Sequence, residues 1–436
     1  DPMLIEFTFS NYRSFRESTT LSMEATGLGA LKSSLIHWKT RRLLPTAAIY
    51  GKNGGGKSNV IRAFWFAVQF VRSAQRMQHE AALVPVQPFL LDEVSAQKPT
   101  SFEFIYIYHG VKYTYGFSAT QTEIVKEYLY HSPKGQPALV FSRNYQKFDF
   151  RENAEKKKRE LISEVVGKNQ LYFSVASTMN EQACIQAMAW FREALFFSRD
   201  FPDIPHQLLS YAENPNMLNA MKHYAKMADV GIQDMHFSFR QESDNEIGPS
   251  MKELPEDIRE AMLQFMKALS DSPNTSEVKL QFGEVKATSF HAGLAADGSQ
   301  KMFPLPLSNE SDGTRKLMSL APDMERVLTN GGLLLVDELE REMHPLLVEM
   351  IVSKFQSPKS NPNHAQLIFT THDTELLNAH LLRKDQLYFA DKDRRTGAST
   401  LYSISDFSTH TSENIHKGYL LGKYGAIPEL PIEEVE

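Results

Sequence analysis

Residues 46–59 read TAAIYGKNGGGKSN, a short apolar run followed by a glycine-rich turn and the start of a periodic segment. The run Thr46–Tyr50 predicts a buried strand, and the apolar spacing from Asn59 to Arg72 predicts a helix. Between them, Gly51 to Ser58 fits the spacing G-x-x-x-x-G-K-[S/T], which is specific when it joins a strand to a helix. The stretch predicts a phosphate-binding loop in an α/β fold, and the alternative is a flexible glycine-rich turn.

The chemistry of this loop follows from its residue types. Glycines let backbone N–H groups converge on phosphate oxygens, and the next helix presents its positive N-terminus. Lys57 would reach the β- and γ-phosphates of ATP, and the Ser58 hydroxyl would ligate Mg²⁺. The residues expected to bind nucleotide here are Asn53, Gly54, Gly55, Gly56, Lys57, Ser58 and Asn59.

A second apolar run, Leu333–Val336, ends in the carboxylates Asp337 and Glu338. Parallel sheets keep their ligands at the carboxyl ends of strands, so Asp337 is expected to hold Mg²⁺ beside Ser58. Glu338 would then act as the general base toward the attacking water. A strand that runs into an acidic turn is common and indicates little alone. The presence of the phosphate loop favours a functional role for Asp337 and Glu338.

Two further segments accompany these motifs. His372 follows the apolar run Gln366–Thr370, so it is expected at the same sheet edge, where it would contact the γ-phosphate; the alternative is an ordinary surface or core histidine. Ser311 and Gly313 precede an apolar-periodic helix, a pattern also typical of a helix N-cap and nothing more.

Composition places the chain among soluble globular proteins. Its 436 residues are 42% hydrophobic and 23% charged, with a formal charge of −6 that offers no global attraction for nucleic acid or a membrane. The single cysteine, Cys184, excludes an internal disulfide. With no run of eighteen apolar residues and no leader-like start, we expect a cytoplasmic protein without a membrane partner.

The patterns along the chain indicate three parts. Residues 3–150 contain strand hairpins (3–23 and 102–117) around the phosphate loop, and 277–436 contain buried strands of the parallel kind. Residues 151–276 show helical spacing and predict a mainly helical insertion, with loops at 241–250 and 271–275. The expected core is a mixed α/β sheet assembled from both ends of the chain, with an antiparallel β-subdomain.

Taken together, these segments resemble the nucleotide-binding head of ABC ATPases of the SMC and RecF type. The sequence is more similar to AAA-type, ABC-like ATPases of bacterial phage-defence and abortive-infection systems, such as AbiLi and RloA, and more distantly to PtuA. The marks of that likeness are Asn11–Phe15, Glu310–Thr314, Asp337–Glu340 with His344-Pro345, Thr371–Asp373, Tyr402–Phe407 and Gly418–Pro428.

The resemblance implies more than the residues show alone. Ser311 and Gly313 would bind the γ-phosphate held by a second subunit, so each site would be shared across a head-to-head homodimer or a higher oligomer. Gln87 is the candidate for the Q-loop glutamine. The D-loop region, where small residues are commoner in the family, is occupied by Glu340, Arg341 and Glu342. Relatives act beside a separate effector protein, often a nuclease.

Other interpretations of the sequence stay open. Asp391 and Asp393 form an acid-x-acid pair that predicts a metal-dependent nuclease site or, alternatively, a solvated turn. A third alternative is a scaffold that senses ATP with negligible turnover. The basic run Lys156–Arg159 could contact nucleic-acid phosphates or form a solvated helix face, and Leu195–Arg199 favours packing within the insertion over a stacking platform for bases.

Overall fold

The computed structural model describes residues 1–77, 83–198, 203–241, 283–377, 380–407 and 415–425. Its contacts divide the chain into two compact units, one made of Asp1–Asp200 with Asp323–Glu436 and the other of Phe201–Pro322. We call them the head unit and the inserted unit. The chain crosses from the inserted unit back to the head unit within helix α9 (Asp312–Asn330), at Pro322.

The centre of the head unit is a six-stranded sheet in the order β11-β15-β16-β5-β17-β18. Its strands are β5 (Thr46–Tyr50), β11 (Leu195–Phe197), β15 (Leu333–Val336), β16 (Gln366–Thr371), β17 (Leu387–Lys392) and β18 (Ser399–Ser403). All neighbours pair parallel except β17 and β18. Every residue of β5, β15 and β16 is buried, which explains their continuous apolar runs.

A second, seven-stranded antiparallel sheet has the order β10-β9-β8-β7-β6-β1-β2. Its strands are β1 (Met3–Ser10), β2 (Thr19–Ser22), β6 (Thr100–Tyr108), β7 (Val111–Ala119), β8 (Ile124–Ser132), β9 (Ala138–Asn144) and β10 (Lys147–Phe150). A small hairpin, β3 (Ile36–Trp38) with β4 (Arg41–Leu43), completes the strands described in the head unit.

Helices fill the space around these sheets. Helix α1 (Lys57–Ser73) buries its apolar face in the main core, where the Phe64 ring lies 4.7 Å from Phe7 and 5.1 Å from Phe104. The other α-helices of this unit are α2 (Lys156–Ser163), α3 (Tyr172–Thr178), α4 (Gln182–Glu193), α10 (Pro345–Gln356) and α11 (Ile415–Leu420). Single 3₁₀ turns lie at Lys32–Ser34, Ala74–Arg76, Ser95–Gln97, Glu375–Leu377, Lys384–Gln386 and Ile404–Asp406.

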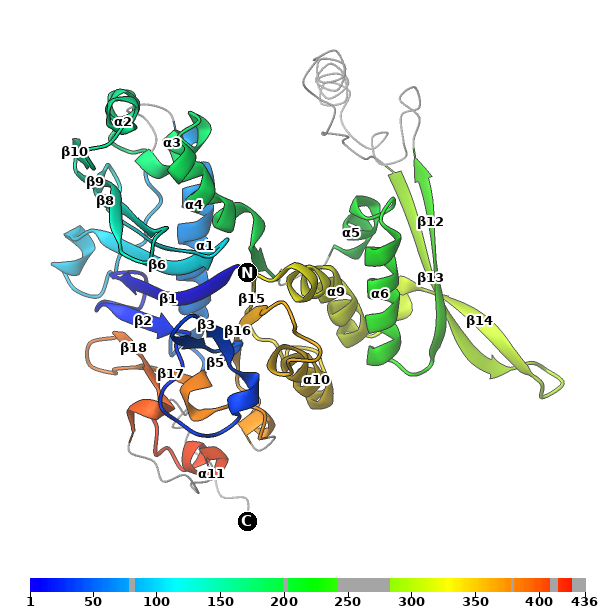
Figure 1. Ribbon diagram of the computed structural model, residues 1–436. Helices are drawn as coiled ribbons and strands as arrows, with labels where there is room; N and C mark the ends of the chain where they lie inside the picture. The colour runs from blue at the N-terminus through cyan, green and yellow to red at the C-terminus, as the bar shows by residue number, and fades with distance from the viewer. Residues whose placement is uncertain (78–82, 199–202, 242–282, 378–379, 408–414, 426–436) are drawn as a thin grey trace. The chain divides into compact units, whose positions relative to one another are not determined.

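The inserted unit combines helices with a separate sheet (Figure 1). Helices α5 (Ile204–Ser210) and α6 (Pro215–Ala228) precede an antiparallel sheet of β12 (Ile232–Gln241), β13 (Gly283–Leu294) and β14 (Gln300–Pro306). The 3₁₀ turn η4 (Leu307–Asn309) then leads into α9. Among the described residues, no helix has both the length and the apolar character needed to cross a bilayer.

The mixed α/β fold class expected from the sequence is confirmed, as are the hairpins β1–β2 and β6–β7 and the parallel pair β15–β16. The predicted insertion differs from the structure in its borders and content. Helices α2 to α4 belong to the head unit, because their apolar faces join its core through residues such as Tyr172 and Trp190. The segment at β12 forms a strand, because it pairs with β13 along most of its length. Residues 242–276 of the predicted insertion, with most of its expected loops, lie outside the described residues.

Leu195–Phe197 was expected to pack within the insertion, and this is wrong. These residues form β11 and pair parallel with β15 in the central sheet. The apolar run therefore serves as an edge strand of the sheet that carries the phosphate loop.

Candidate functional site

The loop from Gly51 to Gly56 joins β5 to α1 and is tightly enclosed. A Cβ atom at Gly51 would lie 2.5 Å from the carbonyl oxygen of Ala390, and one at Gly56 would lie 2.5 Å from Ser399 Oγ. Gly56 also has φ 106°, a conformation that favours glycine. Both positions need glycine because Ala390 of β17 and Ser399 of β18 leave no room for a side chain.

The N-terminus of α1 opens onto this loop. Gly56 is the N-cap residue and supplies no side-chain hydrogen bond, so first-turn N–H groups lack a side-chain acceptor from the cap. Lys57, the first helical residue, is only 4% exposed. Uncapped N–H groups, the helix dipole and a lysine together make a site suited to an anion such as phosphate.

Asp337 and Ser58 meet across the sheet edge. The Ser58 hydroxyl donates a 2.9 Å hydrogen bond to Asp337 Oδ1, although 279 positions separate them in the sequence. Thr370, at the end of the intervening strand β16, also donates its hydroxyl to Asp337 Oδ1. The structure thus brings together the two side chains expected to hold Mg²⁺, and both offer the oxygen atoms that this ion prefers.

Glu338 is held in place by its backbone. Its N–H donates to Thr370 Oγ1 at 2.7 Å, and its φ of 50° lies in the left-handed region, which is uncommon for a residue with a side chain. The carboxylate Oε2 lies 3.9 Å from Nη1 of Arg341, and the side chain is 34% exposed. Glu338 therefore sits directly beside Asp337 with its carboxylate accessible to solvent.

His372 follows β16 and contacts Glu340. Its backbone N–H donates to Glu340 Oε1 at 2.8 Å, and its ring Nε2 lies 3.2 Å from the same oxygen. Next to it, burial raises the pKa of Asp373, and the carboxylates of Glu340 and Glu375 add to the rise. The Tyr50 hydroxyl donates to the Asp373 carbonyl at 3.0 Å, which ties the turn after β16 to the end of β5.

Gln87 is linked to the loop through the segment Asn11–Phe15. Arg13 donates from Nε to Gln87 Oε1 at 2.6 Å and from its backbone N–H to Gln87 O at 2.8 Å. Ser14 Oγ accepts from Asn59 Nδ2 at 2.8 Å and lies 2.8 Å from Ser399 Oγ. A chain of contacts therefore runs from the Q-loop candidate to the helix that begins at the phosphate loop.

Ser311 and Gly313 belong to the inserted unit, whereas the other predicted site residues belong to the head unit. Ser311 Oγ accepts from the Thr314 backbone N–H at 3.2 Å, so the side chain caps the start of α9. The capping role is thus present in the structure, and a role toward a second subunit's nucleotide stays a prediction.

A family model described as "AAA domain, putative AbiEii toxin, Type IV TA system" matches residues 47–378, more than half of the chain. The chain belongs to this AAA family. The matched region runs from β5 past His372 and includes the phosphate loop, Ser311, Asp337 and Glu338. No curated protein sequence matches the chain.

Solved structures similar to this family member include SMC heads and RecF. An SMC head bound to the C-terminal winged-helix domain of ScpA has 12% identity and a TM-score of 0.40, covering 92% of this chain and 97% of that one. The SMC head with an extended coiled coil bound to the C-terminal domain of ScpA, from Pyrococcus furiosus, has 13% identity and a TM-score of 0.38, covering 97% and 99%. RecF with ATP has 12% identity and a TM-score of 0.36, covering 92% and 98%.

In this AAA-family chain, Asp391 and Asp393, the acid pair considered for a nuclease site, contact other groups of the protein. Asp391 Oδ1 lies 3.2 Å from Lys52 Nζ in the phosphate loop. Asp393 Oδ1 accepts from the backbone N–H groups of Arg395 and Thr396 and closes a turn. The two carboxylates therefore support a loop and a turn.

Most side chains of the basic run Lys156–Arg159, at the start of α2, also make contacts within the protein. Lys156 pairs with Glu152 and Glu160, and Lys158 Nζ donates to the carbonyl of Asn180. Arg159 is buried and pairs with Glu181 at 3.0 Å. These contacts favour a structural role for the run over contact with nucleic acid.

Three residues that contact the predicted site were missed as site residues. Thr370 contacts both Asp337 and Glu338, Ser14 contacts Asn59, and Glu340 contacts His372. Thr370 carried a signal in its position, because a hydroxyl at the carboxyl end of a buried parallel strand lies at the ligand edge of the sheet. Ser14 and Glu340 lay within the segments that mark the resemblance.

Proposed function

We propose that this chain is a Mg²⁺-dependent ATPase whose nucleotide state controls the pairing of two heads and, through it, a separate effector in bacterial phage defence. The observation that carries the proposal is the hydrogen bond from Ser58 Oγ to Asp337 Oδ1. It joins a hydroxyl at the N-terminus of α1 to a carboxylate at the end of β15, beside Lys57. Membership of the AAA family supports the same conclusion.

The donor set fits Mg²⁺. A serine hydroxyl and a carboxylate are hard oxygen ligands, and two protein ligands are typical for an ion that also binds substrate phosphates and water. Ser58 and Asp337 would hold the ion. When bound, it would neutralise charge on the β- and γ-phosphates.

The remaining side chains divide the chemistry among them. Lys57 would pair with the β- and γ-phosphates, and the N–H groups of the loop and helix would bind their oxygens. Glu338 would accept the proton of the attacking water, because its backbone is fixed by Thr370 while its carboxylate reaches solvent. His372, oriented by Glu340, would contact the γ-phosphate.

Pairing of heads is the second part of the proposal. Ser311 and Gly313 at the start of α9 would contact the nucleotide held by the partner subunit, so that ATP joins two chains. Hydrolysis would release them, and the cycle would be transmitted to an effector, expected to be a nuclease or toxin. The family description names a "putative AbiEii toxin" of a toxin–antitoxin system, which supports a role in such a system and leaves the separate effector as part of the proposal.

The decisive experiment compares two lysines of the head unit. Lys57→Ala removes the charge next to the helix N-terminus, and we expect it to abolish tight ATP binding in isothermal titration calorimetry. Lys147→Ala is the matched control, because it removes a lysine charge at an exposed position of β10. It should bind ATP with nearly wild-type affinity. Wild-type affinity in a folded Lys57→Ala chain would refute the proposed nucleotide site.

A further inference from the structure

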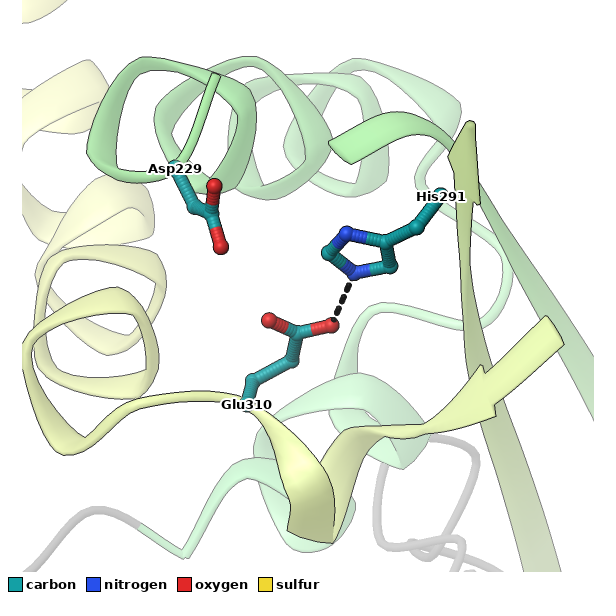
Figure 2. Close-up of side chains that lie close together, drawn as sticks. All are labelled: Asp229, His291 and Glu310. Atoms are coloured by element: carbon teal, nitrogen blue, oxygen red, sulfur yellow. Dashed lines mark hydrogen bonds and ion pairs between the residues drawn. The ribbon is translucent and has the colours of Figure 1, made fainter. Parts of the chain in front are cut away.

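Three side chains of types that can ligate a metal lie close together in the inserted unit (Figure 2). Asp229 follows α6, His291 lies on β13, and Glu310 follows the turn η4. One ligand atom from each residue can be chosen so that all lie within 4.8 Å of one another. Among the described residues this is the only such group of three His, Cys, Asp or Glu side chains.

The group is held by its surroundings. The Glu310 side chain is 3% exposed, and its Oε1 lies 2.7 Å from His291 Nε2 while also accepting from the Ser289 hydroxyl. Asp229 Oδ1 accepts from the Gly231 N–H at 2.7 Å. Each carboxylate is therefore oriented by a hydrogen bond from outside the group, as is usual for metal ligands.

Gly231 leaves room beside the group. A Cβ atom at this position would lie 3.0 Å from Asp229 Oδ1 and 3.1 Å from His291 Nδ1. Glycine therefore lets Asp229 and the imidazole approach the same side of the backbone. Figure 2 shows the Asp229, His291 and Glu310 side chains facing a common space, with the Glu310 carboxylate paired to the imidazole.

We propose that Asp229, His291 and Glu310 bind a divalent transition-metal ion of the zinc class. Imidazole nitrogen with carboxylate oxygen suits Zn²⁺ and its neighbours, whereas Mg²⁺ and Ca²⁺ prefer oxygen alone. Ligand atoms around tetrahedral Zn²⁺ lie about 3.3 Å apart. Zinc binding would therefore narrow the 4.8 Å spread and widen the 2.7 Å contact between His291 and Glu310, both through side-chain movements. Three protein ligands leave one position for water or another ligand.

The metal would act on the segment that enters α9. Glu310 directly precedes Ser311, so an ion held by Asp229 and His291 fixes the backbone immediately before the helix cap. Any effect of the metal on ATP turnover rests on the proposed function. The metal site itself is a property of the inserted unit.

Zinc binding to the full chain tests the site. Chelator-stripped protein is titrated with Zn²⁺ against a chromophoric chelator, and bound metal is counted by mass spectrometry after dialysis. We expect one Zn²⁺ per chain, with affinity at least about tenfold lower in His291→Ala and in Glu310→Gln, since even outer-shell losses cost that much. His236→Ala removes an exposed histidine on the neighbouring strand β12 and should bind like wild type.

Two further measurements make the result decisive. Co²⁺ should give visible absorption bands in the wild-type chain that are lost in Asp229→Asn and kept in His236→Ala. Lys57→Ala should retain full Zn²⁺ binding, which separates this site from the nucleotide site. Circular dichroism confirms that each variant is folded. A wild-type chain that binds no Zn²⁺ at micromolar concentration, or a folded His291→Ala chain that binds it equally well, would overturn the proposal.

Discussion

Glu340 Oε1 accepts a 2.8 Å hydrogen bond from the backbone N–H of His372 and lies 3.2 Å from the Nε2 atom of its ring. One carboxylate oxygen thus fixes both the backbone and the imidazole of the residue expected to contact the γ-phosphate. Glu340 therefore orients the histidine.

Replacing Glu340 should therefore lower turnover without weakening ATP binding. We expect Glu340→Ala to reduce kcat by about ten- to a hundredfold, because the imidazole loses its orientation. Glu340→Gln keeps an acceptor for the backbone N–H and should lose less. Steady-state hydrolysis and calorimetry measure the two effects, and an unchanged kcat in Glu340→Ala would contradict the positioning role.

Glu338→Gln should separate binding from hydrolysis. The amide keeps the shape of the side chain but cannot accept a proton, so we expect kcat to fall by about 10²–10⁴ while ATP affinity is preserved. The trapped nucleotide should hold two chains together. Light scattering with Mg²⁺-ATP should then give twice the mass of the apo chain, and the same mass in both conditions would argue against head pairing.

Mixing two inactive chains tests whether the site is shared. If Ser311 serves the partner's nucleotide, Ser311→Arg would block that site and Lys57→Ala would not bind its own nucleotide, so each homodimer should be inactive. A heterodimer keeps one intact site, made from Lys57 of the first chain and Ser311 of the second. We expect partial recovery of ATP hydrolysis in the mixture. Full activity of Ser311→Arg alone would show that Ser311 serves only as the cap of α9.

A stability prediction concerns Glu127 and Arg143, a fully buried ion pair at 3.3 Å. Glu127 also accepts hydrogen bonds from the backbone N–H groups of Tyr172 and Phe173, so it joins β8 to α3. Burial raises its pKa, and Arg143 opposes that rise. Arg143→Met should lower the free energy of unfolding by about 3–5 kcal/mol, because it leaves a buried carboxylate without its cation.

The control for that measurement is a partly exposed pair. Arg41 contacts Glu24 with both side chains about a third exposed. Arg41→Met should cost less than about 1 kcal/mol, since exposed pairs contribute little. Urea unfolding measures the loss in the free energy of unfolding for each variant. Equal losses would show that burial does not increase the contribution of the Glu127–Arg143 pair to stability.

Local patterns account for what the sequence predicted. The strand, loop and helix at residues 46–73 follow from apolar runs and glycine spacing, which are local properties. The acidic end of β15 could be placed by the rule that parallel strands present ligands at their carboxyl ends. Gln87 could be named only by resemblance, and its contact with Arg13 depends on a loop conformation that no pattern encodes.

Contacts between distant residues could not be predicted in this way. Thr370 meets Asp337 because β15 and β16 are neighbours in the central sheet. Ser14, in the turn between β1 and β2, meets Ser399 of β18, which belongs to the other sheet. The strand β12 was missed for a related reason, since a segment with mixed polar and apolar residues becomes a strand when a partner such as β13 pairs with it. The group around His291 has the same character, as its residues come from three separate elements.

The position of β5 in the middle of its sheet has a consequence for synthesis on the ribosome. Its parallel partners are Leu367–Thr371 and Leu387–Phe389, which are translated long after Thr46–Tyr50. At roughly 5–20 residues per second, this strand, which is fully buried in the folded protein, waits for tens of seconds without a partner. The nascent chain therefore cannot assemble its phosphate loop until β16 and β17 have emerged, and it needs protection from aggregation throughout that interval.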